Sequence, residues 1–532
     1  MMRLTKSISI TRLTLIVSGF ITATCNYKFF VEAIIIYPFQ ENPLFVISLL
    51  FWLFSFLSVV LLLVCYRFNT KFILIALLIC TSVISYFTDN YGVVFDDNMI
   101  DNIFVTNLNE SLDLLSLKLL FYFIFLGFIP AIIVYKAEIT YKTLNQQLWL
   151  KIKAITLLLI LFAGVTLVFS KSYASLLREH KQLRLYINPS YYVYALGKHI
   201  NSQFKTISTP FNKIGEDAFV SRHNNANKLI IVVAGETARA DRFALNGYER
   251  ATNPLLSKQR VINFSQMYSC GTDTALSIPC MFSNLTREDY SHEIGKNTSN
   301  LLDILSYADI KVLWRDNNSS SKGVADRVEF EDFRSADRNM VCDIECRDEG
   351  MLYDLQDYID NNKGKDIVVV LHTMGSHGPS YYRRYPKSFE IFSPVCKTNQ
   401  LNDCTDEQIT NSYDNTIVYT DYFLNNTIEF LKRNKGSFNT AMFYISDHGE
   451  SLGEGGLYLH GMPYFFAPKE QTHVASMIWL DDNFSKEVKI DELKDIAKDK
   501  LSHDSLFHII LGLMDVKTSL YKKELDFIPY VE

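Results

Sequence analysis

Basic side chains form no cluster in this 532-residue sequence, which has 52 Lys and Arg, 58 Asp and Glu and a formal net charge of -6. Nucleic-acid-binding domains carry a basic patch or stripe, so we exclude nucleic acid as a partner. Internal repeats and long low-complexity tracts are also absent. The first apolar segment has no small-residue cleavage site after it and is too long for a signal peptide, so we expect it to stay as a membrane anchor.

Long apolar runs are confined to the first third of the sequence, although 48% of all residues are hydrophobic. Each run is near the length of about 20 residues that crosses a bilayer as a helix. We therefore predict five transmembrane helices, at about residues 12–36, 44–66, 71–88, 115–135 and 153–170.

The positive charges beside these runs predict their orientation, because Lys and Arg near helix ends are retained in the cytoplasm. Basic residues precede the first run, separate the second from the third and separate the fourth from the fifth: Arg3, Lys6, Arg12, Arg67, Lys71, Lys136, Lys142, Lys151 and Lys153. The alternate connections are either short and proline-bearing or acidic. We expect a cytoplasmic N-terminus and five crossings, which leave the large C-terminal region outside.

The cysteines independently indicate an oxidising compartment for that region. Cys25, Cys65 and Cys80 fall in apolar runs, whereas the other six cysteines lie beyond residue 269 in close sequence pairs. Such pairs predict three local disulfides in a periplasmic domain: Cys270–Cys280, Cys342–Cys346 and Cys396–Cys404. A zinc site at Cys342 and Cys346 is the alternative, but no partner C-x-x-C motif or histidine cluster supports it.

Composition divides the chain into three parts. Residues 1–170 are the predicted transmembrane domain, 171–226 a polar and tyrosine-rich periplasmic linker, and 227–532 the periplasmic catalytic domain. Tyrosine prefers the headgroup layer of a bilayer, so we predict short interfacial helices in the linker. A disordered linker is an alternative that the composition leaves open.

Short apolar runs alternate with helical patterns beyond residue 227. The runs typical of strands lie at 228–236, 310–315, 366–375 and 440–450, and the helical patterns lie near 299–308, 349–361 and 409–433. This alternation predicts an α/β domain with a central, mostly parallel sheet and helices on both of its faces. In such sheets the functional residues lie at the carboxyl ends of the strands.

Metal-capable side chains stand where the predicted strands end. Glu236 ends one strand, and Asp447 and His448 end another. Carboxylate oxygen and imidazole nitrogen are normal zinc ligands, and a catalytic zinc site has three protein ligands and one open position. We therefore predict that these three residues bind Zn²⁺. His372 also ends an apolar strand, where a buried core histidine is an equal alternative.

A nucleophile for such a site is available in the segment SCGTDTALSIPC, residues 269–280. A metal ion lowers the pKa of a bound hydroxyl and makes it a usable nucleophile near neutral pH. Thr272 and Thr274 both qualify, in a loop that precedes a helical pattern whose N-terminal N–H groups suit a phosphate. Helix capping by these threonines is the alternative.

Two further histidines, His377 and His460, lie in loops that contain glycine and proline. Their place beside the strands that carry the predicted ligands favours a role in binding phosphate or a second metal ion. An ordinary loop position is the alternative for each.

Four segments follow one another along the catalytic region: VVAGETARADRFALNGYERATNPLL, SCGTDTALSIPCMFS, MGSHGPSYYRRYP and ISDHGESLGEGGLYLHGMP. Together they resemble the lipid A phosphoethanolamine transferases, which include the mobile colistin-resistance enzymes and belong to the alkaline phosphatase and sulfatase superfamily. The resemblance covers nearly the whole chain. It implies that a threonine attacks phosphatidylethanolamine, that diacylglycerol leaves, and that phosphoethanolamine then passes to a lipid A phosphate.

The resemblance also implies roles for individual residues. Thr274 becomes the nucleophile, and the zinc ligands become Glu236, Thr274, Asp447 and His448. His377 and His460 match phosphate or second-zinc contacts, and Lys322 matches a substrate-contacting lysine. Asn102, Thr106 and Glu110 match contacts for the ethanolamine head group. Asn102, Thr106 and Glu110 are four residues apart and would share one helix face, for which a solvated acidic face is the alternative.

The family further implies a monomeric enzyme of the Gram-negative inner membrane that lowers outer-membrane negative charge and confers polymyxin resistance. Three alternatives remain open. The acceptor could be a core sugar of lipopolysaccharide or a protein, the reaction could be glycerol-phosphate transfer as in lipoteichoic acid synthesis, or the chain could be an inactive lipid-binding homologue. A sulfatase is disfavoured because no C/S-x-P-x-R motif occurs near Thr274.

Overall fold

The computed structural model describes residues 7–105, 111–112, 114–208, 210–221 and 226–531. The chain divides into two compact units. We call the first, Met1–Asp97 with Leu115–Lys198, the helical unit, and the second, Asn98–Leu114 with His199–Glu532, the sheet unit.

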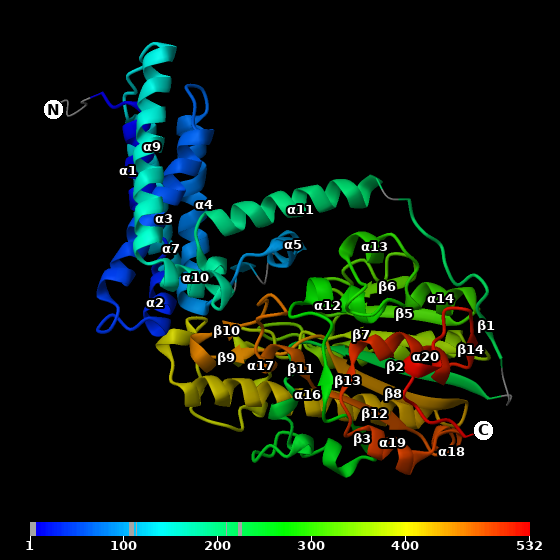
Figure 1. The fold of residues 1–532 in the computed structure, drawn as a ribbon. Helices are drawn as coiled ribbons and strands as arrows, with labels where there is room; N and C mark the ends of the chain where they lie inside the picture. The colour runs from blue at the N-terminus through cyan, green and yellow to red at the C-terminus, as the bar shows by residue number, and fades with distance from the viewer. Residues whose placement is uncertain (1–6, 106–110, 113, 209, 222–225, 532) are drawn as a thin grey trace. The chain divides into compact units, whose positions relative to one another are not determined.

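Four helices among the described residues are long and apolar enough to cross a membrane: α3 (Pro43–Val64), α4 (Thr70–Tyr91), the helix Leu117–Lys136 and α9 (Leu144–Val168). The helix Leu117–Lys136 consists of α7 (Leu117–Tyr122), the π-helix η1 (Phe123–Phe128) and α8 (Ile129–Lys136). A fifth span exists if the bent pair α1 (Ile10–Thr24) and α2 (Tyr27–Ile36) crosses as one (Figure 1).

The first predicted helix is interrupted at Asn26, where the chain bends by 54° between α1 and α2. Asn26 is buried, and its side-chain amide donates to the carbonyl oxygens of Ile21 and Asn188 at 3.0 and 3.1 Å. A side chain that bonds the last carbonyls of a helix favours a helix end over a helix interior. The run predicted at 12–36 therefore consists of two helices, α1 and α2, which by length and composition can cross a membrane together as one broken span.

The segment predicted as a linker contains α10 (Ser170–Arg178), a 3-10 helix at Lys181–Tyr186, and α11 (Ser190–Ser208). α11 has 19 residues and is longer than the short helices expected there. Its residues up to Lys198 belong to the helical unit, and those from His199 belong to the sheet unit.

A seven-stranded sheet forms the centre of the sheet unit (Figure 1). Its strand order is β3 (Val261–Asn263), β12 (Ser476–Leu480), β8 (Phe438–Ser446), β2 (Asn227–Gly235), β7 (Ile367–His372), β5 (Lys311–Asp316) and β6 (Glu329–Asp332). The neighbours from β8 to β6 pair in parallel, whereas β12 pairs antiparallel with both β8 and β3. The sheet is therefore mixed.

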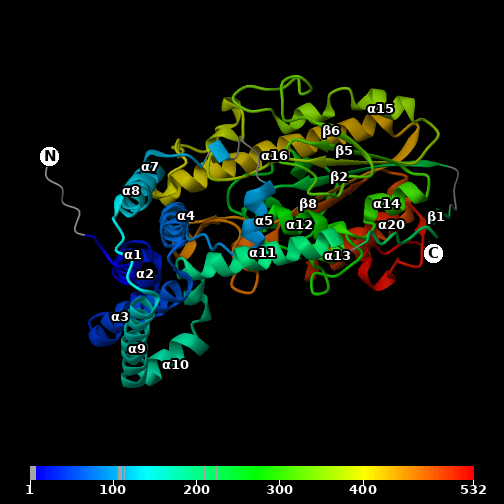
Figure 2. The same cartoon turned by 90° about the horizontal axis from the view of Figure 1, so that it is seen from above.

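Both faces of this sheet are covered. Ile230, Val232 and Ala234 of β2 belong to one apolar cluster with residues of α12 (Thr274–Met281), α14 (Leu301–Tyr307) and α20 (Leu506–Leu513). On the other face, α16 (Asp406–Asn434) packs against β8 (Figure 2). Because both faces of the sheet are buried, the sequence of β2 is a nearly continuous apolar run.

The shorter helices with at least one α-helical turn are α5 (Asp97–Val105), α13 (His292–Lys296), α15 (Leu355–Asn361), α17 (Lys469–Thr472), α18 (Phe484–Glu487) and α19 (Ile490–Ile496). The other strands of the described residues form three small sheets: β1 (Phe219–Val220) with β14 (Val516–Lys517), β9 (Ser451–Leu452) with β10 (Tyr458–Leu459), and β4 (Met267–Tyr268) between β11 (His473–Val474) and β13 (Leu501–Ser502).

The three predicted disulfides are confirmed, since Cys270 bonds Cys280, Cys342 bonds Cys346 and Cys396 bonds Cys404. A zinc site at the second pair is excluded by that bond. The Cys270–Cys280 disulfide ties the approach to α12 to the last turn of that helix.

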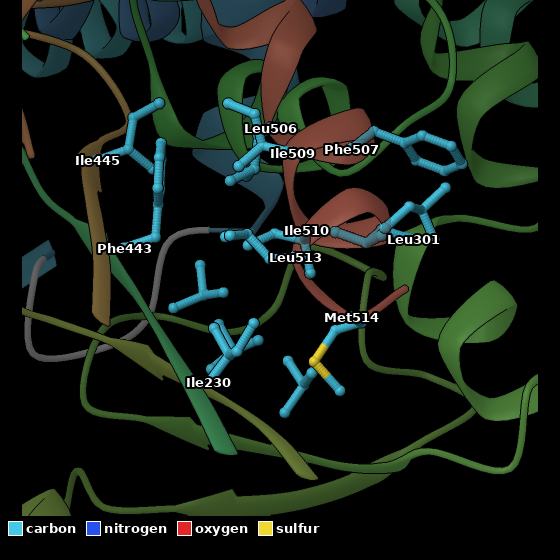
Figure 3. Packing of buried hydrophobic residues seen from close by; sticks show 14 of the residues in the cluster. Ile230, Leu301, Phe443, Ile445, Leu506, Phe507, Ile509, Ile510, Leu513 and Met514 are labelled. Carbon is cyan, nitrogen blue, oxygen red and sulfur yellow. The ribbon is translucent and has the colours of Figure 1, made fainter. Parts of the chain in front are cut away.

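Three side chains of β2 belong to the apolar cluster of the sheet unit. Ile230 is fully buried and faces Ile510 and Leu513 of α20 (Figure 3). We predict that Ile230→Ala lowers the free energy of unfolding by about 2–5 kcal/mol, because it removes apolar contacts and leaves a cavity. Chemical denaturation of the full-length protein in detergent measures the change.

Ile391→Ala is the matched control, since Ile391 is 61% exposed. We expect a change within about 0.5 kcal/mol for this control. Equal losses in the two variants would contradict the assignment of the core to the β2 face.

Candidate active site

The pairing of β2 with β8 builds the centre of the site. These strands are parallel neighbours, and their register ends with Gly235 opposite Ser446. The next residues, Glu236 and Asp447, therefore leave the sheet side by side at the edge where both strands end. His448 follows directly, and the three side chains are buried.

The three side chains converge on one point. His448 Nε2 lies 3.4 Å from Glu236 Oε1 and 3.4 Å from Asp447 Oδ2. One ligand-capable atom from each residue lies within 4.8 Å of those from the other two. Two carboxylates and an imidazole at these separations suit a divalent metal ion.

The protonation and hydrogen bonding of these groups fit a cation. His448 Nδ1 donates to the carbonyl of Gly449 at 2.9 Å, which leaves the lone pair on Nε2 facing the carboxylates. Burial lowers the pKa of His448, which favours the neutral, metal-binding form. Burial also raises the pKa of Asp447, whose Oδ2 accepts no hydrogen bond from the described residues. A positive charge at this point would offset the cost of burying that carboxylate.

Thr274 points its hydroxyl at these ligands. It is the first residue of α12, where the Asp273 side chain caps the helix by accepting from the N–H of Leu276 at 3.0 Å. Thr274 Oγ1 donates to Glu236 Oε2 at 3.1 Å and lies 3.3 Å from His448 Nε2. The helix N-terminus adds backbone N–H groups that favour an anion beside the hydroxyl.

Thr272, the other threonine considered from the sequence, is engaged elsewhere. Its hydroxyl donates to the carbonyl of Met462 at 2.6 Å. The geometry therefore favours Thr274 over Thr272 as the nucleophile, and the capping of α12 is carried by Asp273 rather than by a threonine.

A second group of candidate ligands adjoins the first and consists of His448, Glu450 and His460. His460 Nδ1 lies 2.8 Å from Glu450 Oε2, and the Tyr381 hydroxyl donates to the other oxygen of Glu450 at 2.8 Å. Burial lowers the pKa of His460, but the carboxylates of Glu450, Asp447 and Asp273 together outweigh burial, and the pKa is raised.

His377 lies beside this second group, with its ring centroid 5.5 Å from that of His460. Burial, together with the nearby His460, lowers the pKa of His377, which favours a neutral imidazole. His377 Nδ1 is buried without a hydrogen-bond partner in the part of the chain that the structure describes. Both loop histidines predicted from the sequence therefore face the same site.

Lys322 lies next to a cavity of about 330 Å³ that we call the Lys322 pocket. Its ammonium donates to the Ser319 hydroxyl, and its backbone adopts a left-handed φ of 52°. Ala275, which follows Thr274, also lines this pocket. The pocket therefore opens beside the candidate nucleophile.

The predicted head-group residues are only partly covered by the structure. Asn102 is a half-buried residue of α5. Thr106 and Glu110 lie outside the described residues.

His372 belongs to neither group of candidate metal ligands among the described residues. Its Nδ1 lies 2.9 Å from Asp316 Oδ2 in the core.

Sequence reasoning missed the residues that hold the ligands in place. The Asn318 amide donates to Glu236 Oε2 at 2.7 Å and to the Thr373 carbonyl at 2.9 Å. His503 contacts the carbonyl of Ser446 at 3.0 Å through Nε2, and burial lowers its pKa to about 4. Asn318 carries no motif of its own, whereas Glu450 could have been found, because it follows Asp447 and His448 in the DHGE segment.

Known proteins match both units. Residues 53–204 match the family model for phosphoethanolamine transferase EptA/EptB, and residues 228–516 match the sulfatase model. The chain is 41% identical over 525 residues to the phosphatidylethanolamine transferase Mcr-2 of Escherichia coli, covering 96% of each chain. It is 37% identical over 538 residues to the phosphoethanolamine transferase EptA of Escherichia coli (strain K12), covering 97% of this chain and 96% of that protein.

A solved structure is also similar over nearly the full length. The integral membrane protein lipooligosaccharide phosphoethanolamine transferase A (EptA) from Neisseria meningitidis has a TM-score of 0.94 and 32% sequence identity. The similarity covers 98% of this chain and 99% of that chain.

The hydrogen bond from Asn318 to Glu236 generates a test of the candidate metal site. Groups that orient a metal ligand typically contribute about 10- to 100-fold to metal affinity. We therefore predict that Asn318→Ala lowers the affinity for a divalent metal ion by a factor in this range. Metal content after dialysis against a graded series of chelator concentrations measures the affinity.

Asn362→Ala is the matched control, because the Asn362 amide donates to the Tyr358 carbonyl within α15 and contacts no candidate ligand. It should leave the metal content unchanged. Equal metal retention by Asn318→Ala and the wild type would argue against this role for Asn318.

Proposed function

Because this chain belongs to the phosphoethanolamine transferase family, we propose that it transfers phosphoethanolamine from phosphatidylethanolamine to a phosphate of lipid A. The observation that carries the proposal is the position of Thr274, whose hydroxyl lies within hydrogen-bond distance of both Glu236 and His448. The full-length similarity to phosphoethanolamine transferases supports the substrate class.

The reaction proceeds in two displacements at one phosphorus atom. Thr274 Oγ loses its proton and attacks the phosphorus of phosphatidylethanolamine, and the bond from phosphorus to the diacylglycerol oxygen breaks. Diacylglycerol leaves as the alcohol after it takes up a proton, and phosphoethanolamine stays on Thr274 as an ester. An oxygen of a lipid A phosphate then attacks the same phosphorus, and the threonine hydroxyl is regenerated. Splitting the transfer in this way replaces one difficult step by two easier ones.

Glu236, Thr274, Asp447 and His448 are the proposed ligands of Zn²⁺. Zinc bound there would act as a Lewis acid that favours the ionised threonine and neutralises charge on the phosphoryl oxygens. Glu236 also orients the Thr274 hydroxyl through their hydrogen bond. Glu450 and His460 adjoin His448 and are the proposed place for a second ion, as the alternative to phosphate contact by His460.

The remaining predicted residues have proposed roles around the reacting phosphorus. His377 and His460 bind phosphoryl oxygens, with His460 held in orientation by Glu450. Lys322 contacts the anionic part of the substrate from its pocket beside Ala275. Asn102, Thr106 and Glu110 are proposed to receive the ethanolamine ammonium group.

We propose the following membrane arrangement. The N-terminus is cytoplasmic, the apolar helices cross the inner membrane five times with α1 and α2 as one broken span, and residues 227–532 form the periplasmic catalytic domain. Residues 1–170 and 171–226 remain the proposed transmembrane domain and linker. The three disulfides of the sheet unit support an oxidising compartment. The enzyme is proposed to act as a monomer.

Transfer to lipid A has a direct electrostatic consequence. Each transferred group brings an ammonium ion that offsets negative charge on the acceptor phosphate. Cationic peptides such as polymyxins bind the outer membrane through that negative charge. The proposed activity therefore lowers their affinity and confers resistance.

We predict that the full-length protein, expressed in a Gram-negative host without its own transferases, adds the mass of one phosphoethanolamine to lipid A. Thr274→Ala should abolish the addition because it removes the attacking oxygen. Mass spectrometry of extracted lipid A measures both outcomes. Thr272→Ala is the matched control and should retain the modification, since the Thr272 hydroxyl is bonded to the Met462 carbonyl.

Modified lipid A in the Thr274→Ala strain would contradict the nucleophile. If lipid A is unmodified in the wild type while a core sugar or an envelope protein gains the same mass, the acceptor is wrong but the chemistry stands.

A further inference from the structure

A partly buried carboxylate, Asp101, lies between two histidines, and all three residues belong to the sheet unit. Asp101 of α5 lies between His199 of α11 and His292 of α13. Asp101 Oδ1 is 2.5 Å from His199 Nδ1, and its other carboxylate oxygen is 3.5 Å from His292 Nε2. None of the three residues belongs to the ligand groups or to the proposed chemistry.

All three side chains are largely removed from solvent, with exposed fractions of 12% for Asp101, 9% for His199 and 13% for His292. Phe104, one turn along α5, stacks on the His199 ring with centroids 5.2 Å apart. A carboxylate at this depth is stable only with polar partners. Removal of either imidazole would therefore weaken the attachment of α5.

Asp101 also contributes to the Lys322 pocket. The other residues that line this pocket lie between 275 and 327 in the sequence, so among the described lining residues Asp101 alone comes from α5. His292 lines the pocket as well, whereas His199 does not. One wall of the cavity beside Thr274 therefore depends on the position of α5.

A second contact places α5 against the loop that carries His460. A methyl group added at Gly461 would lie 2.3 Å from Met99 Cε, so the two segments are in close contact. The Gly461 N–H donates to the carbonyl of Thr272 at 2.8 Å, two residues before Thr274. α5 is thus attached on one side through Asp101 and packed on the other side beside residues of the active site.

We propose that Asp101 is a positioning residue for the donor lipid. His199 and His292 hold Asp101, and Asp101 thereby fixes α5 as the wall of the Lys322 pocket next to the head group. α5 carries Asn102, which is one of the proposed head-group residues. This inference rests on the proposed phosphoethanolamine transfer. His199 acts only through Asp101, since it lines no part of the pocket.

The experiment compares the wild type with Asp101→Ala, His199→Ala and the double variant, each as full-length protein. Diacylglycerol release from phosphatidylethanolamine vesicles that also contain saturating lipid A reports steady-state turnover, and the donor concentration is varied. We expect each single variant to raise the donor KM by about ten-fold with kcat changed by less than about two-fold, as for a residue that supports substrate binding. The double variant should resemble the single variants, because both substitutions break one attachment.

Asp309→Asn is the matched control for loss of a carboxylate in an ion pair. Asp309 pairs with Lys365 on the exposed surface before β5, away from the pocket. It should leave KM and kcat unchanged. A fall in kcat at constant KM, multiplicative effects in the double variant, or unchanged kinetics in His199→Ala would overturn the proposal.

Hydrogen–deuterium exchange of residues 97–105 in the same proteins tests the attachment without relying on activity. Faster exchange in Asp101→Ala and in His199→Ala, but not in Asp309→Asn, is the expected result. Unchanged exchange in both would overturn the attachment. Absence of diacylglycerol release from the wild type would instead count against the proposed function and leave the exchange result to decide the role of Asp101 in holding α5.

Discussion

The parallel pairing of β2 with β8 is the constraint on which the site depends. Their register runs from Asn227 opposite Phe438 to Gly235 opposite Ser446 and brings Glu236 and Asp447 out of the sheet together. A slip of one residue would turn one of these carboxylates to the opposite face. The fully buried apolar side chains of both strands oppose such a slip, so the same packing that stabilises the domain also sets the distance between the ligands.

The proximity of the candidate ligands could be predicted because it depends on strand ends. Glu236 and Asp447 follow apolar runs whose length and β-branched content indicate buried parallel strands, and such strands deliver their next residues to a common edge. Asn318, which holds Glu236, could not be predicted in this way. It contacts Glu236 across 82 positions of sequence, and nothing in its own neighbourhood marks the partner. The residues alone left Thr272 and Thr274 open as nucleophiles. The family resemblance implied Thr274, and the hydrogen bonds of the two hydroxyls favour the same residue.

In the fold, too, features that depend on the local sequence could be predicted, and features that depend on distant partners could not. Strands β2, β5, β7 and β8 correspond to predicted runs, whereas β3, β6 and β12 have at most five residues and too weak a pattern to predict. The antiparallel direction of β12 depends on its partners and not on its own periodicity. The break at Asn26 could not be predicted because one of the carbonyls that its amide binds belongs to Asn188, far along the chain.

The central claim is that Thr274, oriented by Glu236 and facing His448, carries phosphoethanolamine during the reaction. The most direct measurement is peptide mass spectrometry of the full-length protein after incubation with phosphatidylethanolamine vesicles in the absence of lipid A. The account predicts the mass of one phosphoethanolamine on Thr274 within residues 269–280, and no such mass in Asp447→Asn. Attachment to another residue, or release of diacylglycerol without any covalent adduct, would contradict it.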